Sequence, residues 1–234
     1  MSTNSHFETR LRGVVLGYSE ASAVRGEDTL KVILPILFIK WLYDISDVES
    51  FEKTLPILRK LELPGNPDWH SFRSMVNADN FTDLVRVIEK ELDDANSVLS
   101  EALLSFQYEQ HSIPKLLDFM WALPVESFVG HAEAVRRVLD ELIERTMYHS
   151  KRMGGEYSTP RAIVSLLLRL LAPKGGTLYD PVCGTGGFLV SASCDYDCTV
   201  SGKDLNLSMV EASLMRLYLS GVYSAKVESE DALY

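Results

Sequence analysis

The sequence predicts a helical part over about residues 1–150, followed by the first part of a doubly wound α/β sheet over residues 151–234. Apolar residues recur at helical spacing through the first part. In the second part, short strand-like runs alternate with helices around a glycine-rich turn, which is typical of open parallel sheets. A chain of 234 residues that is 46% hydrophobic is long enough for one or two domains with a buried core.

Three segments of the first part have the apolar pattern of helices. Residues Thr29–Ser46 form the most apolar one, in which Pro35 is expected either in the first turn or at a kink. Residues Phe81–Phe106 repeat leucine and isoleucine three, four or seven residues apart. Residues Ala132–Tyr148 carry an apolar stripe opposite arginines and glutamates, as expected of a helix lying on a core. Residues Leu63–Ser71 are expected to form a loop because they are rich in Pro, Gly and Asn.

The second part begins with a change in composition near residue 150. Residues Lys151–Tyr157 (KRMGGEY) predict a loop, after which Thr159 is expected to cap a helix and Pro160 to take its first position. That helix is expected to stop at Pro173, since proline cannot continue it. Strand, helix, strand, helix and strand are then expected at residues 177–180, 188–194, 198–203, 208–221 and 226–230.

The segment Asp180–Phe188 (DPVCGTGGF) connects the first predicted strand to its helix. Its glycines Gly184, Gly186 and Gly187 permit a tight turn and a close approach of a ligand to the backbone. The helix start that follows presents unpaired N–H groups, which attract anionic groups. Taken by itself, this turn is either a structural tight turn or a loop that binds a nucleotide-type cofactor.

Two aspartates stand at the ends of the next two predicted strands. Asp204 lies where an acidic side chain of this architecture accepts hydrogen bonds from ribose hydroxyls. Asp231 closes the third strand, where a side chain can meet the amino group of an adenine. Each could instead be a solvated loop carboxylate or a helix cap, but their placement at successive strand ends favours a shared ligand.

Composition excludes several classes of protein. No apolar run reaches the roughly 18 residues that a membrane span requires, and the N-terminus has no secretory signal. The cysteines Cys183, Cys194 and Cys198 form no CxxC pair, which argues against a zinc site or a disulfide framework. We therefore expect a protein of the reducing cytoplasm, without a metal and without membrane contact.

The charge of the chain argues against DNA binding by this chain alone. The net charge is −10, and residues 1–150 hold 15 Lys and Arg against 24 Asp and Glu. Residues 151–234 hold 8 basic against 9 acidic residues. Because phosphate contacts need clustered Lys and Arg, most of the grip on any nucleic acid must come from other subunits.

The segment DPVCGTGGF resembles motif I (DPxCGxGGF) of the adenine-N6 DNA methyltransferases, and in particular that of the modification subunit of type I restriction–modification systems. Residues 154–161 (GGEYSTPR) resemble that subunit's motif X, usually written GEFYTPR, and SGKDLN at residues 201–206 resembles its second acidic motif. The opening helices look like the family's helical N-terminal domain. The resemblance covers essentially the whole chain, and it implies a Rossmann-like, S-adenosylmethionine-dependent methyltransferase domain.

The resemblance assigns cofactor-binding roles to the residues of motif X. Tyr157, Thr159 and Pro160 would shape the methionine end of S-adenosylmethionine. The helix that Pro160 opens would point its positive end toward the carboxylate of the cofactor. Ser158 departs from the family pattern, since an aromatic residue usually precedes Thr-Pro, and this weakens one expected contact.

The remaining cofactor contacts follow from the other matched motifs. Asp180 and the three glycines of the turn would hold the amino acid group of the cofactor. Asp204 would bind its ribose, and Asp231 its adenine. The segment ESEDALY is a loose match to the family's third motif, so the role of Asp231 is the least firmly founded.

The family's catalytic element has no counterpart in the sequence. Adenine methyltransferases of this type receive the flipped base in an Asn- or Asp-Pro-Pro-aromatic element. The chain has nine prolines, and no two of them are adjacent. No catalytic residue is therefore assigned, and we expect a truncated domain that is inactive by itself and that self-associates through its exposed third strand.

Three hypotheses follow. The first is a subunit, or an N-terminal fragment, of a type I adenine-N6 DNA methyltransferase that acts on DNA within a complex containing specificity and restriction subunits. The second is a non-catalytic assembly module derived from such a subunit. The third is a nucleotide- or dinucleotide-binding enzyme with a helical prefix, which is disfavoured because Cys183 stands where the first glycine of GxGxxG would be.

Overall fold

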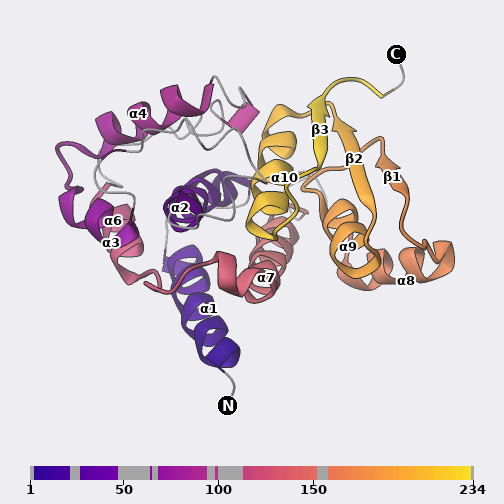
Figure 1. Cartoon of the computed structure of the whole chain (residues 1–234), viewed down its shortest axis with the longest axis horizontal. Helices are drawn as coiled ribbons and strands as arrows, with labels where there is room; N and C mark the ends of the chain where they lie inside the picture. The colour runs from indigo at the N-terminus through magenta and orange to yellow at the C-terminus, as the bar shows by residue number, and fades with distance from the viewer. Residues whose placement is uncertain are drawn as a thin grey trace.

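The computed structural model of the chain describes residues 3–21, 27–46, 64, 68–93, 98–99, 113–151 and 158–232 (Figure 1). The helical part comprises α1 (Thr3–Ala21), α2 (Glu27–Ser46), α3 (Trp69–Met75), α4 (Phe81–Asp93), α6 (Ile113–Ala122), the 3₁₀ helix η4 (Val129–His131) and α7 (Ala132–Lys151). The second part comprises α8 (Arg161–Leu171), β1 (Thr177–Asp180), α9 (Gly187–Tyr196), β2 (Thr199–Asp204), α10 (Leu207–Leu219) and β3 (Lys226–Ser229). The predicted fold class, helices followed by the start of an α/β sheet, is confirmed.

The three strands form one parallel sheet in the order β1-β2-β3, with Asp180 opposite Gly202 and Asp204 opposite Ser229. Helices α9 and α10, which connect the strands, pack on the sheet. In β2, Val200 and Gly202 are buried while Ser201 and Lys203 are partly exposed. The alternation follows from the two-residue period of a strand.

Most element boundaries lie within a few residues of the sequence prediction, with three informative differences. Pro35 lies inside α2 rather than in its first turn. The predicted loop at residues 63–71 ends earlier, because Asp68 accepts a hydrogen bond from the Ser71 N–H (2.8 Å) and caps α3. Of the predicted helix Phe81–Phe106, α4 ends at Asp93, and most of the remainder lies outside the described residues.

Helix α2 is buried almost all round, as expected of a helix whose residues are apolar on every face. It contacts α1, α3, α7 and α10. Trp41 of α2, which is 1% exposed, meets Tyr218 of α10 edge to face with the ring centroids 5.6 Å apart. The helical part and the α/β part therefore share one continuous core, and a domain boundary near residue 150 stays a prediction.

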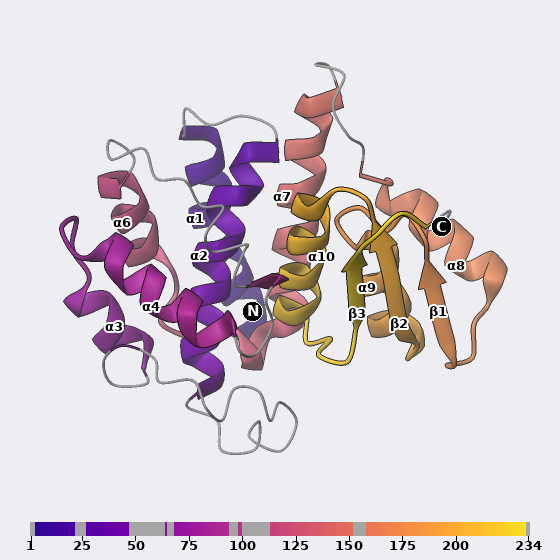
Figure 2. The ribbon, with the colours of Figure 1, turned by 90° about the horizontal axis from the view of Figure 1, so that it is seen from above.

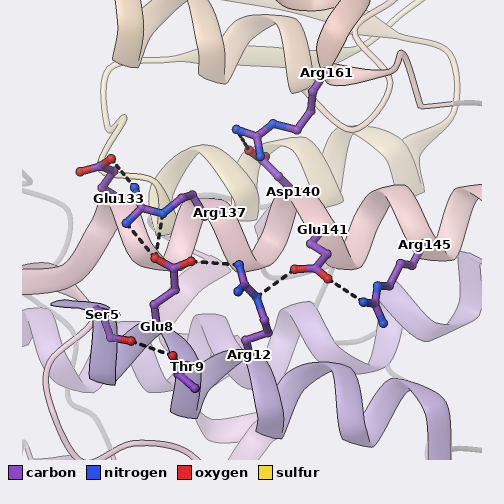
Figure 3. Close-up of polar contacts among 10 residues, drawn as sticks. All are labelled: Ser5, Glu8, Thr9, Arg12, Glu133, Arg137, Asp140, Glu141, Arg145 and Arg161. Atoms are coloured by element: carbon purple, nitrogen blue, oxygen red, sulfur yellow. Dashed lines mark hydrogen bonds and ion pairs between the residues drawn. The ribbon is translucent and has the colours of Figure 1, made fainter. Parts of the chain in front are cut away.

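Helices α1 and α7 lie side by side and are joined by a row of ion pairs (Figure 3). Arg12 of α1 bridges Glu8 and Glu141, with both N–O distances at 2.9 Å. Arg137 pairs with Glu8 (2.8 Å) and Arg145 with Glu141 (2.7 Å). Such surface pairs contribute at most about 1 kcal/mol each, so they fix how the two helices align more than they stabilise the fold.

Large apolar side chains are exposed along one side of the α/β part. On α8 these residues, which we call the α8 surface, are Ile163, Leu166, Leu167, Leu170 and Leu171. By contrast, the exposed residues of edge strand β3 are polar: Lys226, Glu228 and Ser229. Charged residues discourage pairing at a sheet edge, so we place the expected self-association at the α8 surface rather than at β3.

Within the described ranges, no helix combines the length and the apolarity needed to cross a membrane.

Replacing Trp41 by alanine should destabilise both parts of the chain together. A large aromatic residue removed from a core costs about 3–5 kcal/mol, and the contact with Tyr218 transmits this loss to α10. Calorimetry should show one unfolding transition at a clearly lower temperature. The matched control is Trp121→Ala, since Trp121 is 48% exposed and its loss should change the midpoint little. Two transitions, of which only one moves, would contradict a shared core.

Replacing Leu170 and Leu171 by glutamate should suppress self-association of the chain. These side chains are 72% and 62% exposed, so the change removes apolar surface without opening a core. Sedimentation velocity over a concentration series should show wild-type chain forming larger species and the double variant remaining monomeric. Val87→Glu on α4, at a residue 44% exposed, is the control that should still associate. A wild-type chain that stays monomeric at high concentration would refute the expectation.

Candidate functional site

The glycine turn and Asp204 come together at the carboxyl ends of β1 and β2. The Cys183 N–H donates to the Lys203 carbonyl (2.8 Å), so the turn bends from β1 over the end of β2. The next N–H, that of Gly184, donates to Oδ2 of Asp204 (2.8 Å). Ligands of open α/β sheets bind at this edge. The structure thus unites two predicted site elements that are far apart in the sequence.

The turn can cross β2 because residue 202 is a glycine. A Cβ atom at Gly202 would lie 2.9 Å from Leu189 Cδ1, 3.0 Å from the Asp180 carbonyl oxygen and 3.0 Å from Cys183 Cβ. Any other residue would push the turn off the strand. Sequence reasoning did not single out Gly202, although it lies within the SGKDLN segment.

The three glycines of the turn serve different purposes. Gly184 (φ +52°) has no atom within 4 Å of its hypothetical Cβ, so its outer side is open. A Cβ at Gly186 (φ +71°) would lie 2.3 Å from Ser213 Oγ on α10, and one at Gly187 would lie 3.2 Å from Arg216 Nη1. Gly186 is therefore required by packing on α10, Gly187 lies close to the Arg216 guanidinium, and Gly184 is the glycine with open space beside it.

Asp204 holds the backbone of the site through hydrogen bonds. The residue is 8% exposed. Its Oδ2 accepts from Gly184 and its Oδ1 accepts from the Asn206 N–H (2.9 Å), while its carbonyl accepts from the Glu230 N–H (3.1 Å). A carboxylate has about four acceptor positions, so one bond at each oxygen leaves capacity for hydroxyl donors of a ligand. The ribose role predicted for Asp204 fits this geometry and stays a prediction.

Asp180 is a half-buried carboxylate whose charge is poorly compensated. Burial raises the pKa of Asp180, and the nearby charge of Asp204 raises it further, while the hydrogen bond from the Val182 N–H (3.1 Å) opposes both effects. A cationic group bound at this edge would stabilise the ionised form of Asp180. Burial also raises the pKa of the neighbouring Cys183 thiol to about 12, so this cysteine remains protonated and unreactive.

The remaining predicted residues surround this edge less closely. Asp231 lies two residues beyond the end of β3 rather than closing the strand. Thr159 and Pro160 are exposed just before α8, and the helix begins one residue later than predicted, with Pro160 rather than Thr159 at the N-cap position. Figure 2 shows α8 beginning on the side toward which the strand arrows point. Tyr157 lies outside the described residues.

A buried arginine lies behind the turn, and sequence reasoning missed it. Arg216 of α10 is 4% exposed, and its Nη1 donates to the Thr185 carbonyl (3.0 Å). Its Nη2 donates to Asp140 of α7 (2.5 Å), and Asp140 also pairs with Arg161 at the start of α8 (3.3 Å). Charged residues of helices are ordinarily solvated, so no pattern in the sequence predicted that Asp140 and Arg216 form a buried pair.

The parallel strands, the glycine turn into α9 and the acidic residue at the end of β2 define the start of a Rossmann-like unit, preceded by packed helices. Residues 132–231 match the N-6 DNA methylase family. Over these residues the chain is therefore similar to the N-6 DNA methylase family, in agreement with the resemblance found in the sequence.

Two relatives are named as methylase subunits of type I restriction enzymes. That of MjaIX from Methanocaldococcus jannaschii is 25% identical over 137 residues, which are 56% of this chain and 25% of that protein. That of HindI from Haemophilus influenzae is 36% identical over 102 residues, which are 40% of this chain and 23% of that protein. The matches thus span about a quarter of the length of these relatives.

A solved structure shares the fold of nearly the whole chain. It is that of the type I restriction–modification methyltransferase subunit from Streptococcus thermophilus, with a TM-score of 0.62 at 18% sequence identity. The match covers 97% of this chain and 59% of that one. The helical part and the α/β part therefore follow the arrangement of a type I modification subunit.

Replacing Asp180 by asparagine should stabilise the fold while keeping the bond from Val182. Because the folded pKa of Asp180 lies above its usual 3.8, ionisation of this residue destabilises the fold as pH rises between these two values. The gain from Asp180→Asn should be absent below this window and constant above it. We therefore expect Asp180→Asn to melt at a higher temperature than the wild type at neutral pH, with little difference at pH 3.

Thermal melts at pH 3 and pH 7 would measure this difference. The control is Asp68→Asn, because hydrogen bonds from Ser71 lower the pKa of the Asp68 carboxyl and its ionised form favours the fold. That variant should show no gain at neutral pH. A neutral-pH loss of stability in Asp180→Asn would contradict the prediction.

Proposed function

We propose that this chain is the cofactor-binding part of a type I modification subunit, which binds S-adenosylmethionine for methyl transfer to adenine N6 in DNA. The observation that carries the proposal is the open face of Gly184, whose N–H donates to Asp204 (2.8 Å). The family match over residues 132–231 supports the same reaction class.

The groups present fit the parts of such a cofactor. The half-buried carboxylate of Asp180 suits an ammonium group. Burial and the charge of Asp204 raise its pKa, and a nearby cation would stabilise its ionised form. The first N–H groups of α9, which has no side-chain cap at Gly186, suit a carboxylate. Asp204 suits vicinal hydroxyls, and Asp231, beyond β3, is the proposed partner of the adenine. Thr159, Pro160 and Tyr157 are proposed to lie along the methionine end.

The cofactor supplies the methyl group, and this chain's own residues bind and orient it. Effective alignment of the two reactants is the main source of acceleration in a direct transfer. The adjacent-proline element that receives the base in this family is absent from the sequence. We therefore propose that the chain alone does not methylate DNA, and that the base pocket is contributed by further polypeptide.

The partners follow from charge. With a net charge of −10, the chain is proposed to meet DNA only within a cytoplasmic complex, in which specificity and restriction subunits supply sequence readout and most phosphate contacts. A non-catalytic assembly module derived from the same family remains the alternative, and cofactor binding discriminates between the two.

Calorimetric titration of the wild-type chain with S-adenosylmethionine should show one site, and Gly184→Ala should weaken it roughly tenfold, which is about 1.4 kcal/mol. The control is Gly176→Ala at the start of β1. Gly176 also has a positive φ (+85°) and open space around its Cβ position, so it carries a comparable backbone cost away from the site. Equal weakening by both variants would argue against a ligand at Gly184.

The wild-type chain itself decides between the hypotheses. No binding of S-adenosylmethionine would favour the assembly module, and preferential binding of NAD would favour a dinucleotide enzyme. Adenine methylation of DNA after a polypeptide that carries the adjacent-proline element is supplied would test the transfer itself.

A further inference from the structure

Four residues from four segments meet behind the glycine turn. They are Asp140 (α7), Arg161 (α8), Thr185 (the turn) and Arg216 (α10), and we call them the Arg216 cluster. Figure 3 shows its outer half, with Arg161 reaching from the start of α8 toward Asp140 on α7. In the inner half, Arg216 donates to Asp140 (2.5 Å) and to the Thr185 carbonyl (3.0 Å).

Burying this cluster costs free energy, because charged groups lose their contact with water. The side chains of Arg216 and Asp140 are 5% and 7% exposed, so both charges are removed from water. Replacing a buried ion pair by apolar residues is often neutral or stabilising, so core filling alone does not require one. What a guanidinium adds is direction, because its donors lie in a rigid plane. Here that plane joins the Thr185 carbonyl to a carboxylate on α7.

The contacted peptide lies at the centre of the turn. Thr185 stands between Gly184, whose face is open, and Gly186, whose hypothetical Cβ lies 2.3 Å from Ser213 Oγ. The turn is thus seated on α10 on its inner side and open on its outer side. A rotation of the Thr185–Gly186 peptide would break both the Arg216 bond and the bond from the Gly186 N–H to the Cys183 carbonyl (2.9 Å), which closes the turn.

Asp140 connects the same seat to the second predicted cofactor segment. Its Oδ2 pairs with Arg161 (3.3 Å), which directly follows Thr159 and Pro160, and the Arg161 N–H donates to Glu144 of α7 (3.3 Å). One carboxylate on α7 therefore sets the position of the turn through Arg216 and the start of α8 through Arg161.

We propose that Asp140 and Arg216 are positioning residues that align the glycine turn and the start of α8 for the cofactor. The inference rests on the proposed function and adds that affinity for the cofactor depends on a helix outside the α/β unit. Neither residue touches the ligand: Arg216 holds the turn from behind, and Asp140 orients Arg216.

The variants are Arg216→Met, which keeps much of the volume, and Asp140→Asn, which keeps the shape and removes the charge. Arg216→Lys provides the conservative rescue, since one ammonium can hold Thr185 or Asp140 but lacks the planar fork that joins both. The matched control is Arg136→Met. Arg136 of α7 pairs with Asp195 of α9 at 2.8 Å, and its side chain is 14% exposed.

Amide hydrogen exchange of the wild-type chain and the variants, without cofactor, is the first measurement. The Gly184 N–H is bonded to Asp204 and the Gly186 N–H to the Cys183 carbonyl (2.9 Å), so both report the turn. Exchange of these amides should accelerate at least about tenfold in Arg216→Met and Asp140→Asn, less in Arg216→Lys, and not in Arg136→Met. Amides of the buried helix α2 should keep their protection.

Titration with S-adenosylmethionine is the second measurement, in which Arg216→Met and Asp140→Asn should bind roughly 10- to 100-fold more weakly. Unchanged exchange at Gly184 and Gly186 would overturn the inference, as would equal acceleration in α2, since the pair would then serve only global stability. If Arg216→Met does not fold, Asp140→Asn decides. If the wild-type chain binds no cofactor, the proposed function fails, while the exchange rates still show whether the cluster positions the turn.

Discussion

The structure depends on the burial of helix α10. Every residue from Met209 to Leu219 is buried, including the polar Glu211, Ser213 and Arg216. A helix enclosed on all sides needs partners on all sides, and α10 finds them in α2, α7, α9 and the strands β2 and β3 (Figure 2). The helical part is therefore not an appendage of the sheet. Its helices α2 and α7 pack against α10, and the glycine turn rests on α10.

This constraint changes how the glycine motif is interpreted. Three glycines in a turn suggest three close approaches of a ligand, yet two of them face α10. A Cβ atom would lie 2.3 Å from Ser213 at Gly186 and 3.2 Å from Arg216 at Gly187, and among the three glycines only Gly184 has open space at this position. Gly202, outside the turn, is as strictly required as any of them because the turn crosses it. A substitution at Gly186 that abolished binding would thus report packing first and the ligand second.

The sequence predicted the order and type of the elements well, because periodicity and turn chemistry act locally. The strand that ends at Asp180, the glycine turn and the helix after it are each predicted from residues that lie close together in the sequence. Helix α8 begins one residue later than predicted. The residue types of Thr159 and Pro160 satisfy the preferences of the N-cap and N1 positions, and only tertiary contacts decide which residue becomes the N-cap. Asp204, the last residue of β2, was singled out because a parallel sheet brings successive strand ends together.

What the sequence could not predict was pairing over long separations. Arg216 and Asp140 are 76 residues apart, and each sits in a helix where a charged residue is unremarkable. Only the assembled structure shows that both are buried and that they meet behind a carbonyl of the turn. The same limit applies to α8, since its sequence does not show that Leu166, Leu170 and Leu171 are exposed in the folded chain.

The pairing of the arginines also bears on the proposed role of this acidic chain in a complex that methylates DNA. Arg12, Arg137 and Arg145 are each held by glutamates along α1 and α7 (Figure 3). A guanidinium already bonded to a carboxylate must give up that bond before it can grip a phosphate, and the exchange gains little. The basic residues of α7 thus serve the assembly of the helices. In the proposed complex they would leave phosphate binding to other subunits, and the contribution of this chain would be a turn held in one conformation.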